Sequence, residues 1–148
     1  MIRPAMEQDV GAIVRMSAAF YATTTYSAVT GMDADTVEVL TRGLISTGVM
    51  LVAELDGDVV GMIGLVIAPF LFDNSIKTAH EVVWYVSPQV RGGRIGVELM
   101  RAAEDACREK GAKAVQMVML ANSPPVAARI YESMGYARSE ACFTKRLA

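Results

Sequence analysis

A glycine-rich segment, placed between an apolar run and an amphipathic run, is the first candidate for chemistry. It reads Arg91-Gly92-Gly93-Arg94-Ile95-Gly96 and begins five residues after Val86. At a helix start, backbone N–H groups lack intrahelical partners and carry partial positive charge, so they can bind an anion. Glycines let the backbone approach a phosphate closely, and Arg91 or Arg94 could add a charged contact. The segment indicates either a phosphate-binding loop or a glycine-rich turn without a ligand.

Two other phosphate-binding patterns are excluded. The P-loop requires Gly, four residues, and then Gly-Lys-Ser or Gly-Lys-Thr, which this chain lacks. The dinucleotide fingerprint Gly-x-Gly-x-x-Gly is not matched either, because the spacing after Gly93 is wrong. No nucleotide-binding fold is therefore predicted.

The elements that would position this segment form an α/β pattern. Pro88 ends the strand before it, and the helix after it has apolar residues at helical spacing and a C-terminal Gly111. Asp56-Gly57 predicts a hairpin turn, while Gly61 and Gly64 predict a bulge or a close backbone approach. After a very short strand, we expect helices over 7–20 and 33–45, the second capped by either Asp33 or Asp35. Strands are expected over 49–55, 59–68 and 80–86, followed by a helix over 95–110, a strand over 114–120 parallel to 80–86, a helix over 124–134 and a closing strand over 141–147.

Composition limits the class of protein. The chain has 148 residues, 53% of them hydrophobic, with a net charge of -2 and no repeat or linker, so we expect one domain over 1–148 and no nucleic-acid partner. Cys107 and Cys142 do not make a disulfide framework. Because the N-terminus lacks a signal pattern and no apolar run approaches 20 residues, we expect a cytoplasmic protein without a membrane partner.

The glycine-rich segment resembles the coenzyme motif of the GNAT family of N-acetyltransferases. That motif is Arg or Gln, two residues, Gly, one residue, and Gly or Ala, five residues after a strand-ending Val. Arg91 and Gly96 take its outer positions, whereas Arg94 stands where the family has its middle Gly. Around Glu81 to Gly96 the likeness is to phosphinothricin-type acetyltransferases. Further matches to the family lie downstream, at Asn122, Ala127, Tyr131, Gly135-Tyr136 and the final run Phe143 to Leu147.

The resemblance implies a single-domain α/β GNAT-like fold that binds acetyl-CoA as a cosubstrate and needs no metal. Its mixed, mostly antiparallel sheet would have one parallel crossover pair, splayed to hold coenzyme A, and about four flanking helices. Asn122 would bind the pantetheine arm, or else cap a helix. The other implied coenzyme-binding residues are Trp84, Tyr85 and Val86, through main-chain amides facing the acetyl carbonyl, and Arg91, Gly92, Gly93, Arg94, Ile95 and Gly96.

The resemblance also implies the catalytic groups. Tyr131 would protonate the departing thiolate, unless it is simply a packed helix residue. The base would be His80 or Glu81, and strand alternation sends these neighbours to opposite faces unless a bulge intervenes. Histidine takes up a proton near neutral pH, but Glu81 fits the phosphinothricin-like pattern and is preferred.

The expected reaction is direct acetyl transfer to a primary amine of a small molecule or amino-acid derivative, in a ternary complex. Cys107 lies within a predicted helix and is a poor acyl-enzyme nucleophile. The acceptor would lie between residues 21–32 and a loop over 69–78, where Phe70, Leu71 and Phe72 could wall a pocket, cover the core or form a homodimer interface. The alternative hypotheses are a noncatalytic acyl-CoA sensor or interaction module, and a structural domain that binds nothing.

Overall fold

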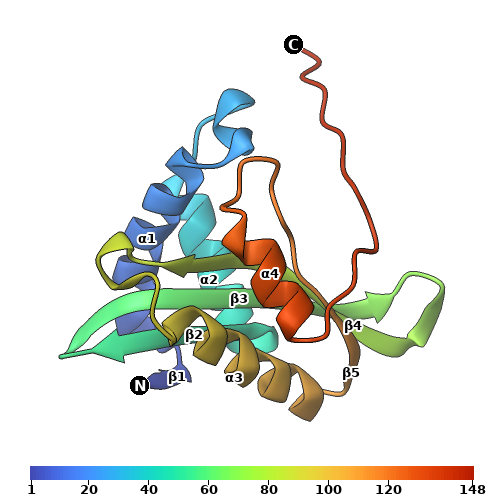
Figure 1. The fold of residues 1–148 in the computed structure, drawn as a ribbon, viewed down its shortest axis with the longest axis horizontal. Coiled ribbons are helices and arrows are strands. Elements are labelled where there is room, and N and C mark those ends of the chain that lie inside the picture. The colour runs from blue at the N-terminus through green and yellow to red at the C-terminus, as the bar shows by residue number, and fades with distance from the viewer.

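Five strands form one mixed sheet in the computed structural model, which describes residues 1–148 (Figure 1). The order in space follows the chain, and every neighbouring pair is antiparallel except the last, which is parallel. The strands are β1 (Ile2–Pro4), β2 (Val49–Leu55), β3 (Asp58–Phe70), β4 (Asp73–Val86) and β5 (Ala112–Gln116).

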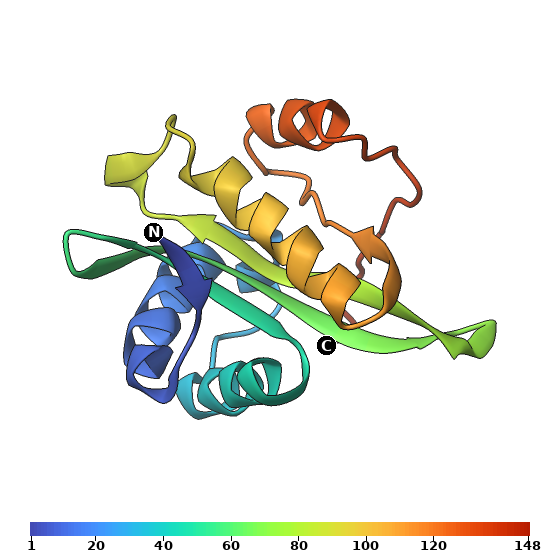
Figure 2. The same cartoon turned by 90° about the horizontal axis from the view of Figure 1, so that it is seen from below.

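Two pairs of helices cover the two faces of this sheet (Figure 2). α1 (Val10–Ala22) and α2 (Ala34–Thr47) pack on one face, while α3 (Ile95–Glu109) and α4 (Val126–Ser133) pack on the other. Each pair covers its own apolar cluster, which includes the fully buried Leu99 under α3 and the fully buried Met62 beneath α1 and α2. No helix is both long enough and apolar enough to cross a lipid bilayer.

The predicted helix and turn signals are confirmed at several positions. The Asp33 carboxylate accepts a hydrogen bond of 2.9 Å from the Thr36 amide and so caps α2. Asp56 (φ 52°) and Gly57 (φ 85°) form the two-residue turn between β2 and β3, a conformation that Gly adopts at low cost. Helix α3 ends just before Gly111, as expected.

The glycines of β3 mark bulges and close packing, as the sequence predicted. Gly64 pairs with Val83 and Leu65 with Glu81, so Val82 is an extra residue in β4. A methyl group at Gly64 would lie 2.9 Å from the Met50 sulfur and 3.0 Å from a Leu44 methyl group. The missing side chain therefore lets α2 approach the sheet closely.

The loop expected over 69–78 is wrong. Phe70 pairs with Asp73, so only Leu71 and Phe72 form the turn, and the rest of the segment extends β3 and β4 into a long hairpin. In the polar run Asp73-Asn74-Ser75 only Asp73 has a pairing partner, Phe70, and regular pairing resumes at Lys77 after an irregularity. The Asp73 carboxylate accepts a hydrogen bond from the Ser75 amide (3.0 Å), so the run looks like a loop by composition but is held within the hairpin.

The closing strand expected over 141–147 is also wrong. No secondary structure follows α4, and the tail runs away from the sheet edge (Figure 1). Phe143 and Leu147 are 98% and 90% exposed. Residues 141–147 alternate in polarity, but alternation makes a strand only when a partner edge pairs with it, and no β5 residue pairs with the tail.

Candidate active site

The parallel pair β4 and β5 separates before β4 ends. Its last paired residues are His80 and Gln116, and beyond them β4 runs to Val86 with no strand on that edge. β5 ends at Gln116 rather than at residue 120, because the Val118 amide donates to the Glu81 carboxylate (2.9 Å) instead of pairing with the β4 backbone. The end of β4 therefore has main-chain polar groups that no neighbouring strand uses.

The bulge at Val82 decides which way Glu81 points. Glu81 pairs with Leu65, which belongs to the cluster under α3, so the Glu81 side chain lies on the α3 and α4 face. Burial raises the pKa of Glu81 to about 7, although the Val118 amide bond acts in the opposite direction. A carboxyl group with this pKa can take up and release a proton near neutral pH.

Tyr131, on α4, is hydrogen bonded to the backbone of the same residue, Val118. Its hydroxyl donates a 2.8 Å hydrogen bond to the Val118 carbonyl, and its ring centroid lies 5.5 Å from that of Trp84. Burial raises the pKa of Tyr131 well above its usual range, and the Glu81 charge raises it further. The structure thus brings Glu81, Trp84 and Tyr131 together around Val118.

His80 is not part of this group. It pairs with Val66, which lines a hollow against α2, so the histidine lies on the opposite face of the sheet. Its Nε2 atom is 2.9 Å from the Thr78 hydroxyl, and its Nδ1 atom is 2.8 Å from the Gln116 side-chain oxygen. Both ring nitrogens are therefore already hydrogen bonded.

The loop between β4 and α3 presents a run of free backbone donors. None of the amides from Gly92 to Val97 donates a hydrogen bond to another backbone group. Gly92 has φ +85°, a conformation that favours glycine, whereas a methyl group at Gly93 would meet only the Val90 carbonyl at 3.7 Å. Neither backbone conformation nor packing within the chain therefore requires a glycine at position 93. A glycine there is consistent with a position that a ligand must approach closely.

The two arginines of this loop behave differently. The Arg91 guanidinium is engaged, because its Nε donates to the Val86 carbonyl (2.6 Å) and the group lies 5.2 Å from the Tyr85 ring centroid. Arg94 has an ordinary helical conformation, its side chain is 86% exposed, and its nearest carboxylate is Glu98 at 3.5 Å. An arginine in place of the family's middle Gly thus fits without backbone strain.

The other residues predicted to bind the coenzyme lie on different elements and on different faces of the sheet. Trp84 lies on the α3 face and donates to the Gly96 carbonyl (3.2 Å), whereas Tyr85 is buried on the α1 face. Ile95 and Gly96 form the first turn of α3. Asn122 does not cap a helix: its amide donates to the Thr23 carbonyl and ties the loop after β5 to the end of α1.

Sequence reasoning missed Val118 and the bulge residue Val82. Val118 acts through its peptide group, so its side chain gives no signal, whereas Gly64 beside the bulge was a usable sign of irregular pairing. No three His, Cys, Asp or Glu side chains lie close enough together to hold a metal ion.

Solved structures share this fold at low sequence identity. A transcriptional regulator from Bacillus halodurans is 21% identical with a TM-score of 0.78, and the match covers 99% of each chain. A predicted acetyltransferase with acetyl-CoA from Clostridium acetobutylicum is 12% identical with a TM-score of 0.77, covering 99% of this chain and 95% of that one. Glucosamine-6-phosphate N-acetyltransferase from Arabidopsis thaliana is 18% identical with a TM-score of 0.73, and the match covers 100% of this chain and 98% of that one.

A comparison with curated protein sequences found no match. The model of the Acetyltransferase (GNAT) family, in contrast, matches residues 20–136. That range includes the unpaired end of β4, the glycine-rich loop, Val118 and Tyr131. The chain therefore belongs to the Acetyltransferase (GNAT) family.

Proposed function

We propose that this chain is an N-acetyltransferase that moves an acetyl group from acetyl-CoA to a primary amine of a small molecule or amino-acid derivative. The observation that carries the proposal is that Glu81 and Tyr131 both hydrogen bond to the backbone of Val118, beside the unpaired end of β4. Aminolysis of a thioester requires one group that accepts a proton from the amine and another that donates a proton to the departing thiolate. Acetyl-CoA is the acyl donor used by the family to which the chain belongs.

The glycine-rich loop supports coenzyme binding. The free amides from Gly92 to Val97 suit the pyrophosphate, and the exposed guanidinium of Arg94 is available for a phosphate oxygen. Main-chain groups of Trp84 to Val86 would hold the acetyl carbonyl, with Asn122 near the pantetheine arm. The likeness of residues 81–96 to phosphinothricin-type acetyltransferases remains a prediction.

Glu81 would act as the base. A carboxylate with a pKa of about 7 takes a proton from the ammonium group, through a water molecule, and leaves a neutral amine. That nitrogen attacks the thioester carbonyl carbon, forming the C–N bond. His80 is the weaker candidate, because it lies on the opposite face with both ring nitrogens bonded.

Tyr131 would act as the acid. When the tetrahedral intermediate collapses, the C–S bond breaks and the thiolate of coenzyme A takes the Tyr131 hydroxyl proton. The nitrogen, which became positively charged on attack, releases a proton as the neutral amide forms, and this proton restores the Tyr131 hydroxyl through water. The raised pKa keeps this phenol protonated at neutral pH. A covalent cysteine route is disfavoured because Cys107 is fully buried and burial raises its pKa to about 11.

The test is a steady-state assay of coenzyme A release from acetyl-CoA over a panel of primary amines. At least one amine should accelerate release and appear as its acetamide by mass spectrometry. Glu81→Gln should lower kcat/KM by roughly 10² to 10³ and remove the rise in kcat/KM near pH 7, whereas His80→Gln should change it less than about threefold. Tyr131→Phe should lower kcat by at least roughly tenfold.

The matched control is Glu132→Gln, which removes an exposed carboxylate on the same helix as Tyr131. It should leave both kinetic constants unchanged. Tight acetyl-CoA binding without acetylation of any amine would contradict the proposal and favour an acyl-CoA sensor instead.

A further inference from the structure

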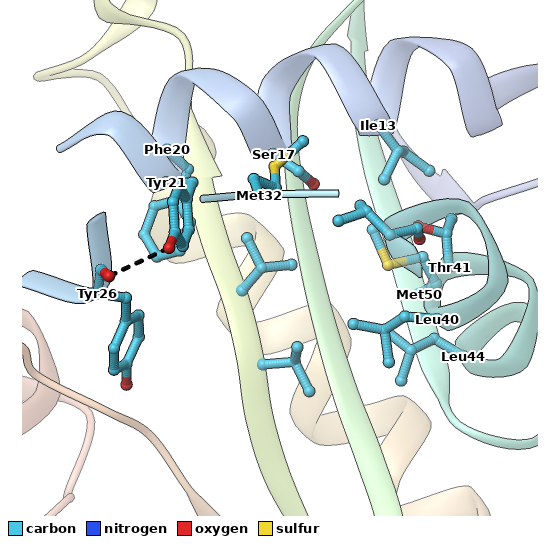
Figure 3. Close-up of a pocket in the computed structure, with 13 residues that line it drawn as sticks. Ile13, Ser17, Phe20, Tyr21, Tyr26, Met32, Leu40, Thr41, Leu44 and Met50 are labelled. Carbon is cyan, nitrogen blue, oxygen red and sulfur yellow. Dashed lines mark hydrogen bonds between the residues drawn. The ribbon is translucent and has the colours of Figure 1, made fainter. Parts of the chain in front are cut away.

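A pocket of about 180 Å³ lies on the α1 and α2 face of the sheet (Figure 3). Of its 13 lining residues 11 are hydrophobic, and none carries a charge. Side chains from α1, from α2 and from the segment between them point into it, including Phe20, Met32 and Leu40 (Figure 3). This uncharged surface offers nothing to pair with a carboxylate, a phosphate or a second ammonium group.

Two of the four hydroxyl groups that line the pocket, those of Tyr21 and Thr41, are already hydrogen bonded, whereas those of Ser17 and Tyr26 are not. Thr41 donates to the Val37 carbonyl at 2.7 Å. The single Tyr21 hydroxyl proton is shared between the Thr30 carbonyl and the Tyr26 carbonyl at 3.1 Å, the second of which is drawn in Figure 3. Ser17 makes no hydrogen bond within the chain. A polar ligand group entering here would lose its water and find few partners, which costs free energy.

The pocket adjoins the proposed base through the bulge in β4. Both Val82 and Val83 line it, although consecutive strand residues normally face opposite sides. Val82 can do so because it is the extra residue of the bulge, and the preceding residue, Glu81, faces the opposite side of the sheet. Beyond His80 no strand pairs with the outer edge of β4, so the amine of an acceptor held here would reach Glu81 around that edge.

We propose that this pocket binds the non-reacting part of the acceptor, and that the acceptor is a primary amine bearing one compact, uncharged apolar group. The inference rests on the proposed function and narrows its substrate class. An apolar cavity of roughly 150 Å³ accommodates benzene, so a single aromatic ring or a branched five-carbon chain matches the volume here. Zwitterionic amino acids, polyamines and sugar phosphates are excluded as good acceptors, because no lining residue balances their second charge.

The test compares amines of nearly equal basicity that differ in the buried group: ethylamine, 3-methylbutylamine and the diamine putrescine. Each buried methylene contributes about fourfold in affinity, so kcat/KM for 3-methylbutylamine should exceed that for ethylamine by roughly 50-fold, with putrescine the poorest. Ser17→Leu would fill the pocket and should lower kcat/KM for 3-methylbutylamine at least tenfold while leaving ethylamine within threefold. Val39→Leu, on the exposed side of α2, is the matched control and should change neither value.

A second variant keeps the test valid if Ser17→Leu does not fold. Tyr26 is half exposed at the pocket, so Tyr26→Ala should fold and still lower kcat/KM for 3-methylbutylamine several-fold without affecting ethylamine. Binding of 3-methylbutan-1-ol, measured by calorimetry, reports on the pocket without turnover. It should be strong for the parent protein and lost in Ser17→Leu.

Different failures have different meanings. Equal or better turnover of putrescine, or an equal effect of Ser17→Leu on all amines, would overturn the inference and leave the proposed function intact. A preference for butyryl-CoA over acetyl-CoA that Ser17→Leu abolishes would also overturn it, because the pocket would then hold the acyl chain. If no amine is acetylated although the alcohol binds, the proposed function itself fails, and the acceptor assignment fails with it.

Discussion

Glu81 is a partly buried carboxyl group that forms no ion pair, an unusual combination because burial disfavours the charged form. Its one protein contact is the Val118 amide, which stabilises the charged form only in part. Such a group is retained at a cost to stability, and strongly perturbed carboxyl groups in clefts are often functional. This cost can be measured as a change in the free energy of unfolding.

We predict that Glu81 makes stability fall as the pH rises. Its pKa is about 7 when folded and 4.5 as its ordinary value, so between these values the folded chain holds a proton that the unfolded chain has lost. The stabilisation is complete below pH 4.5 and is lost through pH 7. Urea denaturation of the parent and Glu81→Gln proteins should show their difference growing by up to about 3 kcal/mol between pH 4.5 and 8. Identical pH dependence in both proteins would refute a buried carboxyl group.

At the scale of elements, α2 packs closely against the sheet at positions where glycine leaves no side chain between them. Gly48 ends α2, and a methyl group there would lie 2.5 Å from the Leu65 carbonyl oxygen and 3.1 Å from a Leu44 methyl group. The Leu65 oxygen belongs to the β3 backbone and cannot move without disturbing the ladder. This contact sets how closely α2 can seal one side of the apolar pocket.

Gly48→Ala should therefore destabilise the fold. Forcing an atom into such a contact costs about 1 to 3 kcal/mol. Gly43→Ala on the same helix is the control: its methyl group meets nothing within 4 Å, and Ala in a helix interior is better than Gly by about 0.5 to 1 kcal/mol. Chemical denaturation should separate the two variants in opposite directions, and equal stabilities would contradict the packing described for α2.

At the scale of the whole molecule, the candidate site forms only because three distant parts of the chain meet. Glu81 comes from β4, Val118 from the segment after β5, and Tyr131 from α4. The sheet separates this group from the apolar pocket, with the bulge at Val82 lying between them. If the two proposals above hold, the coenzyme lies on one face of the sheet and the apolar group of the acceptor on the other.

Acetyl-CoA should stabilise the whole domain. A ligand at about 100 times its Kd adds about 2.7 kcal/mol, so Tm should rise by roughly 5 to 10 °C. Gly93→Val should fold with an unchanged Tm, because the space at Gly93 is open, but should show a much smaller shift if phosphates approach there. Scanning calorimetry with and without acetyl-CoA measures both effects, and a full shift in Gly93→Val would place the phosphates elsewhere.

The sequence by itself determined the local features. The Asp33 cap, the Asp56-Gly57 turn, α3 with its Gly111 end and the positions of the coenzyme motif all follow from residue chemistry over a few positions. These features are predictable because neighbouring residues supply all the interactions that they need.

Only the tertiary structure decided which side chains meet. The bulge that turns Glu81 toward Tyr131, the early end of β5, the long β3–β4 hairpin and the unpaired tail over 141–147 all depend on pairing between distant segments. A one-residue shift in register sends a side chain to the other face, and no local pattern records it. The loop from Arg91 to Gly96 was visible in the sequence, whereas the meeting of Glu81 and Tyr131 at Val118 depended on that register.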